Sequence, residues 1–476
     1  MGKIIKNICC IGAGYVGGPT MAVIAYKCPN IIVNVVDTNQ QRVDAWNSNN
    51  LSKLPVFEPG LDEIISEVRG KNLFFSSNVE KNIANADIIF ISVNTPTKTK
   101  GLGAGKASDL KWIELCTRQV AKFALGHTIV IEKSTLPVRT AKVIEQILVE
   151  SQSKHFGDQS DKSFDILSNP EFLAEGSAIQ DLLNPDRVLI GGSNKKAIDS
   201  LSKIYENWIP KEKILHTNLW SSELAKLTAN AFLAQRISSI NTISALCEKT
   251  GANVMQVSEA IGLDHRIGKK FLNAGPGFGG SCFQKDLLNL VYISESLGLK
   301  QVAEFWNQVN EINTWQRKRI SKLIIEKLFN TVIGKRIGIL GFSFKANTND
   351  TRESSAIQIC RDLLEDGAFL IIHDPKVNFK DIENCLGTKS INYPAINSPA
   401  NLDGLWSFSD DINKTFQNSD ALVIITEWSE YSKIDWGIVS KSMRKPGWIF
   451  DTRGIVNIKE VRRNGLKIWV VGNGEL

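Results

Sequence analysis

The chain has 476 residues, with a hydrophobic content of 43%, a charged content of 22% and a formal net charge of +6. A single domain runs to about 100–200 residues, so this length predicts a multidomain globular protein, and the composition excludes a disordered or fibrous chain. Basic residues are spread along the sequence, and no run is longer than short clusters such as Lys269–Lys270 and Arg317–Lys318–Arg319, which gives no basic stripe for nucleic acid.

The eight cysteines form no C-x-x-C pair, a pattern typical of free thiols in a reducing compartment. No apolar run reaches the length of about 18 residues that a membrane span needs. The first residues lead directly into a strand-like segment and carry no signal-peptide pattern. We therefore expect a cytoplasmic protein without a membrane span.

Residues 1–220 alternate near-continuous apolar runs with segments long enough to form helices. Parallel strands that are buried on both faces show this pattern, so we predict a doubly wound α/β sheet. The expected strands are Asn7–Ile11, Ile31–Val36, Asp87–Val93, Thr128–Ile131, Phe164–Leu167 and Val188–Ile190.

A glycine-rich motif follows the first expected strand and opens a helix. It consists of Gly12, Ala13, Gly14, Tyr15, Val16 and Gly17. In this context the glycines permit a tight turn, close approach of a pyrophosphate and close packing of helix on strand. Asp37 ends the second expected strand, where a carboxylate accepts hydrogen bonds from a ribose and repels a 2′-phosphate. The motif predicts NAD, although the nearby Arg42 keeps NADP open.

Two more polar segments lie at the carboxyl ends of expected strands, the edge where open α/β sheets bind ligands. They contain Val93, Asn94, Thr95, Pro96 and Thr97, and then Ser134, Thr135 and Leu136. Cofactor contacts and ordinary turn or capping roles explain these hydroxyl-bearing residues equally well.

The segment Asn169–Gly176 has the pattern of a helix start, with Asn169 as N-cap and Pro170 in the first helical position. Glu171 and Glu175 would then share one helix face. Capping alone accounts for acidic residues in a first turn, and the sequence slightly favours that simpler interpretation.

The stretch from Ser221 to Thr250 contains no turn residue before Gly251 and predicts one long helix, which opens a helical region at 221–331. Lys226 and Asn230 are four residues apart, so they share a face among apolar and small neighbours. We interpret them as a polar pair directed into a site; the alternative is a solvated helix face.

The segment from Gly277 to Asp286 brings one cysteine to the start of a helix expected at Phe283–Leu297. A thiol at a helix N-terminus, with Lys285 nearby, favours a thiolate nucleophile. Asp286 lies four residues after Cys282 and shares its helix face. We expect the other seven cysteines to be small buried residues.

Residues 332–476 repeat the alternating pattern without a glycine fingerprint, which predicts a second Rossmann-like domain. A helix is expected at Ser355–Asp366, ending at Gly367. The expected strands are Ile337–Leu340, Phe369–Ile372, Ala421–Ile425, Trp448–Phe450 and Ile468–Val471. The predicted fold is thus two Rossmann-like α/β domains joined by a long central helix and a helical region.

Six motifs, in this order along the chain, resemble the UDP-glucose/GDP-mannose dehydrogenase family, and within it the eukaryotic UDP-glucose 6-dehydrogenases. They are GAGYVGGPT at Gly12–Thr20, ISVNTPT at Ile91–Thr97, EKST at Glu132–Thr135, NPEFLAEG at Asn169–Gly176, GFGGSCFQKD at Gly277–Asp286 and DTRESS at Asp350–Ser355.

The resemblance implies an NAD-binding domain at 1–220, a dimerisation region at 221–331 and a UDP-sugar-binding domain at 332–476. It implies NAD-dependent oxidation of UDP-glucose to UDP-glucuronate through a cysteine thiohemiacetal and thioester. It also implies a homodimer as the minimum unit, commonly assembled into a hexamer, and no metal.

The resemblance also implies roles for individual residues. The catalytic set is Cys282, Lys226, Asn230, Asp286, Glu171 and Thr135. Further NAD contacts are Glu175, Cys282, Lys285 and Arg352. Substrate contacts are Glu171, Phe172, Leu173, Ala174, Glu175, Lys226, Asn230, Arg266, Phe278, Gly279, Phe344, Lys345 and Arg453, with Arg266 reaching across the dimer.

Two departures from the family pattern are Asn273, where animal members carry lysine, and the Thr452–Gly454 segment around Arg453. GDP-mannose and UDP-N-acetylmannosamine dehydrogenases use the same scaffold and remain alternatives. An inactive NAD- or UDP-sugar-binding regulator is a further alternative, but it would not need the complete set of reactive side chains.

Overall fold

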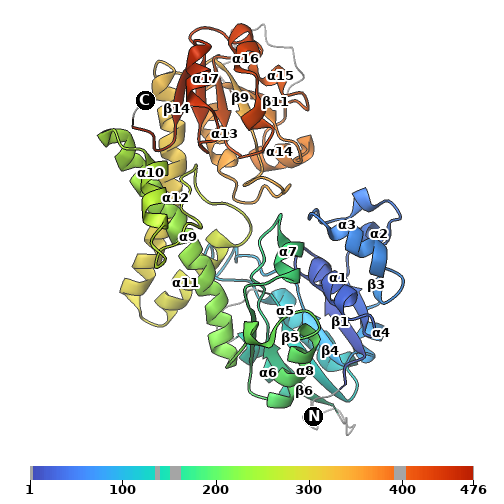
Figure 1. Ribbon diagram of the computed structural model, residues 1–476. Coiled ribbons are helices and arrows are strands. Elements are labelled where there is room, and N and C mark those ends of the chain that lie inside the picture. Colours follow the sequence, from blue (N-terminus) through green and yellow to red (C-terminus); the bar gives the residue numbers. More distant parts are fainter. Residues whose placement is uncertain (1–3, 135–139, 151–161, 391–403, 475–476) are drawn as a thin grey trace. The chain divides into compact units, whose positions relative to one another are not determined.

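The computed structural model describes residues 4–134, 140–150, 162–390 and 404–474. Tertiary contacts divide the chain into two compact units, one of residues 1–229 and 288–299 and one of residues 230–287 and 300–476 (Figure 1). Each unit contains one β-sheet.

The strands of the first unit agree with the apolar runs of the sequence. They are β1 (Asn7–Ile11), β2 (Ile32–Val36), β3 (Leu73–Ser76), β4 (Ile88–Ile91), β5 (His127–Glu132), β6 (Ser163–Ser168), β7 (Val188–Gly192) and β8 (Ile214–Thr217). Their order in the sheet is β3-β2-β1-β4-β5-β6-β7-β8. Because the chain moves outward from β1 in both directions, the doubly wound prediction is confirmed.

One pair departs from the parallel arrangement that we predicted. β6 and β7 are antiparallel, with Leu167 opposite Gly192 and Ser168 opposite Gly191. The connection between them turns back at the carboxyl end of β6 instead of crossing over the sheet, so β7 enters from the same edge.

Helices cover both faces of the first sheet. On one face lie α1 (Gly17–Lys27), α2 (Gln40–Asn47), α3 (Leu61–Val68), α7 (Ala178–Leu183) and α8 (Lys195–Tyr205). On the other lie α4 (Val79–Ala84), α5 (Lys111–Phe123) and α6 (Thr140–Glu150). Ile24, Trp46 and Leu201 belong to the first core, and Val120 and Ile144 belong to the second. Two cores on one sheet explain why its central strands are apolar throughout.

The helical region that we predicted after residue 220 contains α9 (Leu219–Thr250), α10 (Val254–Gly262), α11 (Phe283–Ser296) and α12 (Lys300–Lys327). α9 has 32 residues and confirms the long central helix. In the second unit α9 packs on α12, where Ser238 Oγ donates to Val309 O at 2.9 Å and Arg319 pairs with Glu248 at 2.8 Å.

The second sheet is also doubly wound. Its strands are β9 (Arg336–Leu340), β10 (Phe369–His373), β11 (Leu405–Phe408), β12 (Ala421–Ile424), β13 (Trp448–Asp451) and β14 (Lys467–Val470). Their order is β11-β10-β9-β12-β13-β14, and neighbouring strands are parallel.

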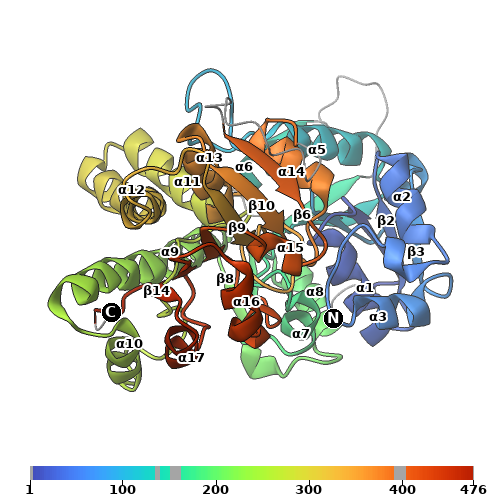
Figure 2. The same cartoon turned by 90° about the horizontal axis from the view of Figure 1, so that it is seen from above.

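Helices again lie on both faces of this sheet. α13 (Ser355–Glu365) and α14 (Phe379–Leu386) cover one face, whereas α15 (Asn413–Phe416), α16 (Trp436–Ser442) and α17 (Ile458–Arg463) cover the other (Figure 2). Both Rossmann-like domains of the predicted fold are therefore present.

Candidate active site

The glycine motif forms the turn between β1 and α1. Gly12 has φ +109°, and a Cβ there would collide with Ser92 O, while a Cβ at Gly17 would collide with Gly12 O. A Cβ at Gly14 would meet no atom within 4 Å. The first and third glycines thus serve the fold, and the second leaves open space beside the turn. These residues fit a bound pyrophosphate.

Asp37 follows β2 and is buried. Its Oδ2 accepts from Ala13 N at 3.0 Å and lies 3.0 Å from Arg42 Nη1, while its Oδ1 accepts from Asn39 N at 2.9 Å. The charge of Arg42 is therefore directed at Asp37. Asp37 thus places a carboxylate at the carboxyl end of β2, where Rossmann folds that bind NAD carry an acidic residue.

The two other cofactor segments lie beside each other at the sheet edge. Ser134 Oγ donates to Val93 O at 2.7 Å, and Thr95 is buried. Thr135 and Leu136 lie outside the described residues.

The segment after β6 does not start a helix at Pro170, as we predicted, and α7 begins only at Ala178. Asn169 is buried and uses its side chain for tertiary contacts: Nδ2 donates to Leu189 O at 2.8 Å, and Oδ1 accepts from the Tyr205 hydroxyl at 2.6 Å. These contacts replace local capping, so Glu171 and Glu175 do not share a helix face.

Glu171 and Lys226 form a buried ion pair in the first unit. Their Oε1 and Nζ atoms are 3.5 Å apart, and the side chains are only 6% and 5% exposed. The other oxygen of Glu171 has no hydrogen-bond partner among the described residues. The Phe172 ring lies between two cations, with Arg187 at 3.8 Å and Lys226 at 5.4 Å from its centroid. A buried carboxylate with one open oxygen is suited to proton transfer.

Cys282 lies directly before α11 in the second unit, as predicted, and its side chain is half-buried. One turn later, Asp286 is buried and its Oδ2 accepts from Asn230 Nδ2 at 2.6 Å. Lys285 Nζ is 3.6 Å from Asp286 Oδ1. Of the other cysteines, all are buried except Cys385, which is half-buried.

Lys226 and Asn230 stand one turn apart on α9, and both are buried. The alternative of a solvated helix face is therefore wrong. Two charged or polar side chains on a buried face need partners or a ligand to offset desolvation.

The glycine loop before Cys282 lies against the segment after β9. Gly279 has no room for a Cβ, because Glu353 O and the Phe344 side chain lie too close. Arg453 holds the same segment: its Nη2 donates to Phe344 O at 3.0 Å and its Nε to Ile425 O at 2.7 Å. Phe278, Gly279, Phe344 and Arg453 are thus brought together in the second unit, in agreement with a shared binding role.

Arg352 contacts the glycine loop through its backbone, and Arg266 contacts its own turn. The Arg352 guanidinium pairs with Asp350 at 2.7 Å, and the Arg352 backbone carbonyl accepts from Gly280 N at 2.8 Å. Arg266 is exposed and its guanidinium pairs with Asp264, two residues away, at 2.6 Å. No described residue outside this turn is bonded to the Arg266 guanidinium.

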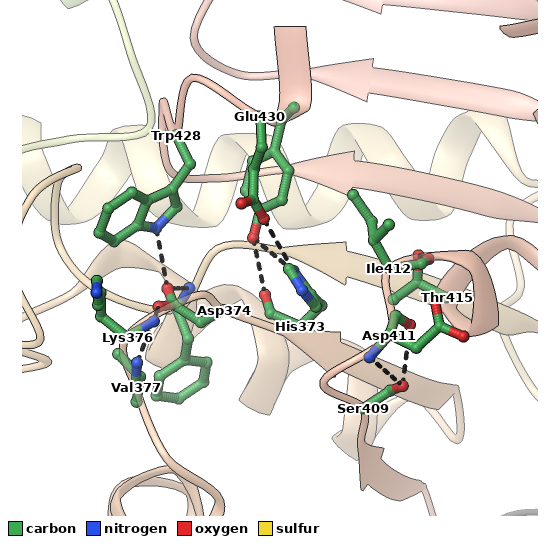
Figure 3. A network of polar contacts seen from close by, with 12 residues as sticks. His373, Asp374, Lys376, Val377, Ser409, Asp411, Ile412, Thr415, Trp428 and Glu430 are labelled. Atoms are coloured by element: carbon green, nitrogen blue, oxygen red, sulfur yellow. Dashed lines mark hydrogen bonds and ion pairs between the residues drawn. The ribbon is translucent and has the colours of Figure 1, made fainter. Parts of the chain in front are cut away.

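Asp374, which the sequence motifs did not predict, positions the segment after β9. Its Oδ2 accepts from Phe342 N at 2.7 Å and from Ser343 N at 3.0 Å. The same oxygen accepts from Trp428 Nε1 at 3.2 Å (Figure 3). These bonds fix the chain immediately before Phe344 and Lys345. Its place at the carboxyl end of β10 was the available sequence clue.

Beside this network the second unit has a pocket of about 450 Å³. Four carboxylates and one lysine contribute to its lining: Asp410, Asp411, Glu430, Asp435 and Lys433. Their net negative charge would repel a diphosphate, so this pocket is unsuited to a sugar nucleotide.

Three family models match successive parts of the chain. They are the NAD binding domain (residues 6–209), the central domain (220–315) and the UDP binding domain (338–458) of the UDP-glucose/GDP-mannose dehydrogenase family. The chain belongs to this family. The predictions of a dehydrogenase and of NAD as its cofactor are confirmed.

Members of this family from several kingdoms are similar over nearly the whole chain. UDP-glucose 6-dehydrogenase 4 of Arabidopsis thaliana is 52% identical over 98% of this chain and 97% of its own length. UDP-glucose 6-dehydrogenase of Drosophila melanogaster is 53% identical over 98% of this chain and 96% of its own length.

The fold comparison agrees with the sequence comparison. A UDP-glucose dehydrogenase structure from Pyrobaculum islandicum superposes with a TM-score of 0.81 at 28% identity, covering 99% of this chain and 98% of the other. Within the described residues of this family member, no helix is long and apolar enough to cross a membrane, and no cluster of three side chains could hold a metal ion.

Proposed function

We propose that this protein oxidises UDP-glucose to UDP-glucuronate with NAD, by two hydride transfers at C6 of the sugar. The observation that carries the proposal is the start of α11, where Cys282 precedes Asp286 by one turn and Asn230 is bonded to Asp286 at 2.6 Å. A binding protein has no need of a thiol at a helix N-terminus beside such a pair. The names of the relatives at 52–53% identity support UDP-glucose as the substrate.

The first step converts the C6 alcohol to an aldehyde. Bound NAD supplies the hydride acceptor, and the turn at Gly12–Gly17 and Asp37 would hold it. Glu171, whose second carboxylate oxygen has no partner among the described residues, takes the hydroxyl proton. Such general-base catalysis contributes roughly 10²–10⁴-fold.

The second step needs a tetrahedral carbon, because the aldehyde itself cannot release a hydride. The Cys282 thiolate adds to the carbonyl carbon, forming a C–S bond and a thiohemiacetal. Lys226 and Asn230 donate to the oxygen on that carbon, and each donor contributes about 3 kcal/mol in comparable oxyanion sites. The C–H hydrogen then leaves as hydride to a second NAD, the negative charge on the held oxygen forms a C=O bond, and a thioester remains.

Hydrolysis completes the reaction. Water held by Asp286 and Thr135 attacks the thioester carbon, the C–S bond breaks and Cys282 leaves as thiolate. Glu171 assists by proton transfer, and Lys226 and Asn230 again hold the oxygen. The overall change consumes one water and reduces two molecules of NAD.

The remaining residues are proposed to bind the two ligands. NAD contacts would come from Val93–Thr97, Ser134–Leu136, Glu175, Cys282, Lys285 and Arg352. The UDP-sugar would contact Glu171–Glu175, Lys226, Asn230, Phe278, Gly279, Phe344, Lys345 and Arg453. The junction of Gly279, Phe344 and Arg453 described above supports the second set.

We also propose that the active site is shared between subunits, with a homodimer as the minimum unit and a homohexamer as the full assembly. The exposed Arg266 supports this, because its only bonded partner among the described residues is Asp264 in its own turn. The functional parts would be residues 1–220, 221–331 and 332–476. Free thiols at all eight cysteines suit a cytoplasmic enzyme.

The test is a panel of UDP- and GDP-sugars incubated with the full-length protein and NAD. We expect two NADH per sugar acid formed, and only with UDP-glucose at a high rate. Cys282→Ala should abolish acid formation while NAD and UDP-glucose binding, measured by calorimetry, stay within about threefold. Preference for a GDP-sugar or an N-acetylated sugar would refute the substrate assignment. Wild-type acid formation by Cys282→Ala would refute the covalent mechanism.

Sharing of the active site has its own test. Inactive Arg266→Ala and inactive Cys282→Ala subunits are mixed under conditions that exchange subunits. We expect activity to return, because each mixed dimer contains one intact site. Mixed dimers that stay inactive would contradict the proposal.

A further inference from the structure

A second buried lysine lies close to the Glu171–Lys226 pair. Lys133 follows β5 directly, and its side chain is buried. Its Nζ donates to Asn169 Oδ1 at 3.1 Å and lies 3.5 Å from the Tyr205 hydroxyl. Both of these groups are neutral, and no carboxylate of the described residues lies within ion-pair distance of Nζ. A buried ammonium with only neutral partners is expensive, so its position calls for a function.

Asn169 connects this lysine to Glu171. Besides accepting from Lys133 and Tyr205, its side chain donates to Leu189 O at 2.8 Å, and its backbone N donates to Glu132 O at 2.9 Å. Every one of these bonds fixes the turn after β6, and Glu171 lies two residues further along that turn. The position of the Glu171 carboxylate therefore depends on Asn169, whose Oδ1 accepts the hydrogen bond from Lys133 Nζ.

Electrostatics connect the same residues. Burial lowers the pKa of Lys133 to about 8, while the charge of Glu171 raises it and the charge of Lys226 lowers it. The attraction between Lys133 and Glu171 is mutual, so a positive Lys133 also attracts the Glu171 carboxylate.

Three other titratable groups lie near Lys133. Cys10 on β1 and Tyr205 on α8 both have a pKa raised by burial, so they stay protonated at pH 8. Glu132, the preceding residue, has a raised pKa because it is buried beside Glu223. Lys133 therefore loses its charge near pH 8 while Cys10 and Tyr205 remain neutral.

We propose that Lys133 is a positioning residue for Glu171: its ammonium holds Asn169 in place and supplies a second positive charge near the Glu171 carboxylate, besides that of Lys226. The inference rests on the proposed function, in which Glu171 is the general base. When Lys133 loses its proton, Glu171 retains Lys226 but loses this second charge, and kcat falls.

The experiment compares pH profiles of kcat for UDP-glucose oxidation. The variants are Lys133→Met, which removes the charge at similar length, and Tyr205→Phe, which removes the other donor to Asn169 and keeps the charge. The wild type should lose activity as pH rises through about 8. At pH 7 we expect Lys133→Met to lower kcat about tenfold, the size typical of one neighbouring charge at a few ångströms.

The profiles separate positioning by charge from a merely structural role. Lys133→Met should lack the fall near pH 8, whereas Tyr205→Phe should keep it. If Lys133→Met kept the wild-type fall near pH 8, or if the two variants changed alike, the inference would be overturned. If Lys133→Met does not fold, Lys133→Arg replaces it. Its fall near pH 8 should disappear, and an unchanged fall would overturn the inference.

Failure of the proposed function would look different. In that case the wild-type protein would not oxidise UDP-glucose at any pH, and no profile could be recorded. A wild-type enzyme with two NADH per product and an unaltered Lys133→Met profile would leave the function intact and remove only the role of Lys133.

Discussion

Replacing Asp37 with asparagine tests the cofactor site most directly, because the change preserves shape and removes one charge. In the structure Asp37 Oδ2 accepts from Ala13 N at 3.0 Å and pairs with Arg42 at 3.0 Å. In Asp37→Asn, an amide nitrogen in place of Oδ2 would face two donors, Ala13 N and Arg42 Nη1. The bond to Ala13 is worth about 1.5–3 kcal/mol as a hydrogen bond to a charged group. The Arg42 pair adds little, because Arg42 is 42% exposed.

This loss should raise the KM for NAD by about 10–100-fold, since 1.4 kcal/mol corresponds to a factor of ten. Arg42 is released at the same time, so activity with NADP should rise. The assay is kcat/KM with each cofactor at saturating UDP-glucose. Asp44→Asn is the matched control, because Asp44 is exposed on α2 and bonded to Gln40 there. Adding Arg42→Ala to Asp37→Asn should abolish the gain with NADP. An unchanged KM for NAD in Asp37→Asn would refute our assignment of the carboxylate to the ribose.

Three more outcomes are expected. Gly17→Ala should abolish NAD binding in calorimetry and lower Tm, because its Cβ would collide with Gly12 O; unchanged NAD binding would contradict this role of the turn. Arg453→Met should raise the KM for UDP-glucose about tenfold with little change in the KM for NAD, because a charge-assisted bond to the Phe344 segment is lost. Glu132→Gln should flatten the pH dependence of Tm, because an amide cannot titrate. The raised pKa of Glu132 makes the wild type lose stability as pH rises above 4.5. A variant that kept the wild-type slope of Tm against pH would contradict this account.

The sequence was most informative where strands are buried on both faces. β1 was predicted with its observed bounds, and β4, β5 and β9 within two residues, because a continuous apolar run is nearly specific to such strands. The strands that we missed, β3, β8 and β11, are all four residues long and lie at sheet edges. β8 has only Ile214 fully buried, so its sequence carries no such run.

The site was predictable where burial and spacing coincided. Lys226 and Asn230 were singled out because apolar neighbours surround them on α9, and their burial excludes a solvated helix face. Asn169 was misinterpreted because Asn-Pro is a good local helix start, whereas Lys133, Tyr205 and Leu189 offered stronger tertiary bonds. No local pattern distinguishes Lys133 or Asp374 from ordinary residues after a strand, since their partners come from distant parts of the chain.

Burial of the Lys133 charge, at the carboxyl end of β5, lowers the stability of the folded protein. Lys133 has a pKa of about 8 in the folded protein against 10.5 for an ordinary lysine, so burying its ammonium at neutral pH costs about 3 kcal/mol. The sign follows from proton binding: between pH 8 and 10.5 the unfolded chain binds more protons, so stability rises over that range and the cost is fully present below pH 8. A methionine at this position would avoid that cost while losing only the bonds to Asn169 and Tyr205. The charge of Lys133 therefore does not stabilise the domain. Such a cost in stability is expected of a residue that supports a neighbouring general base.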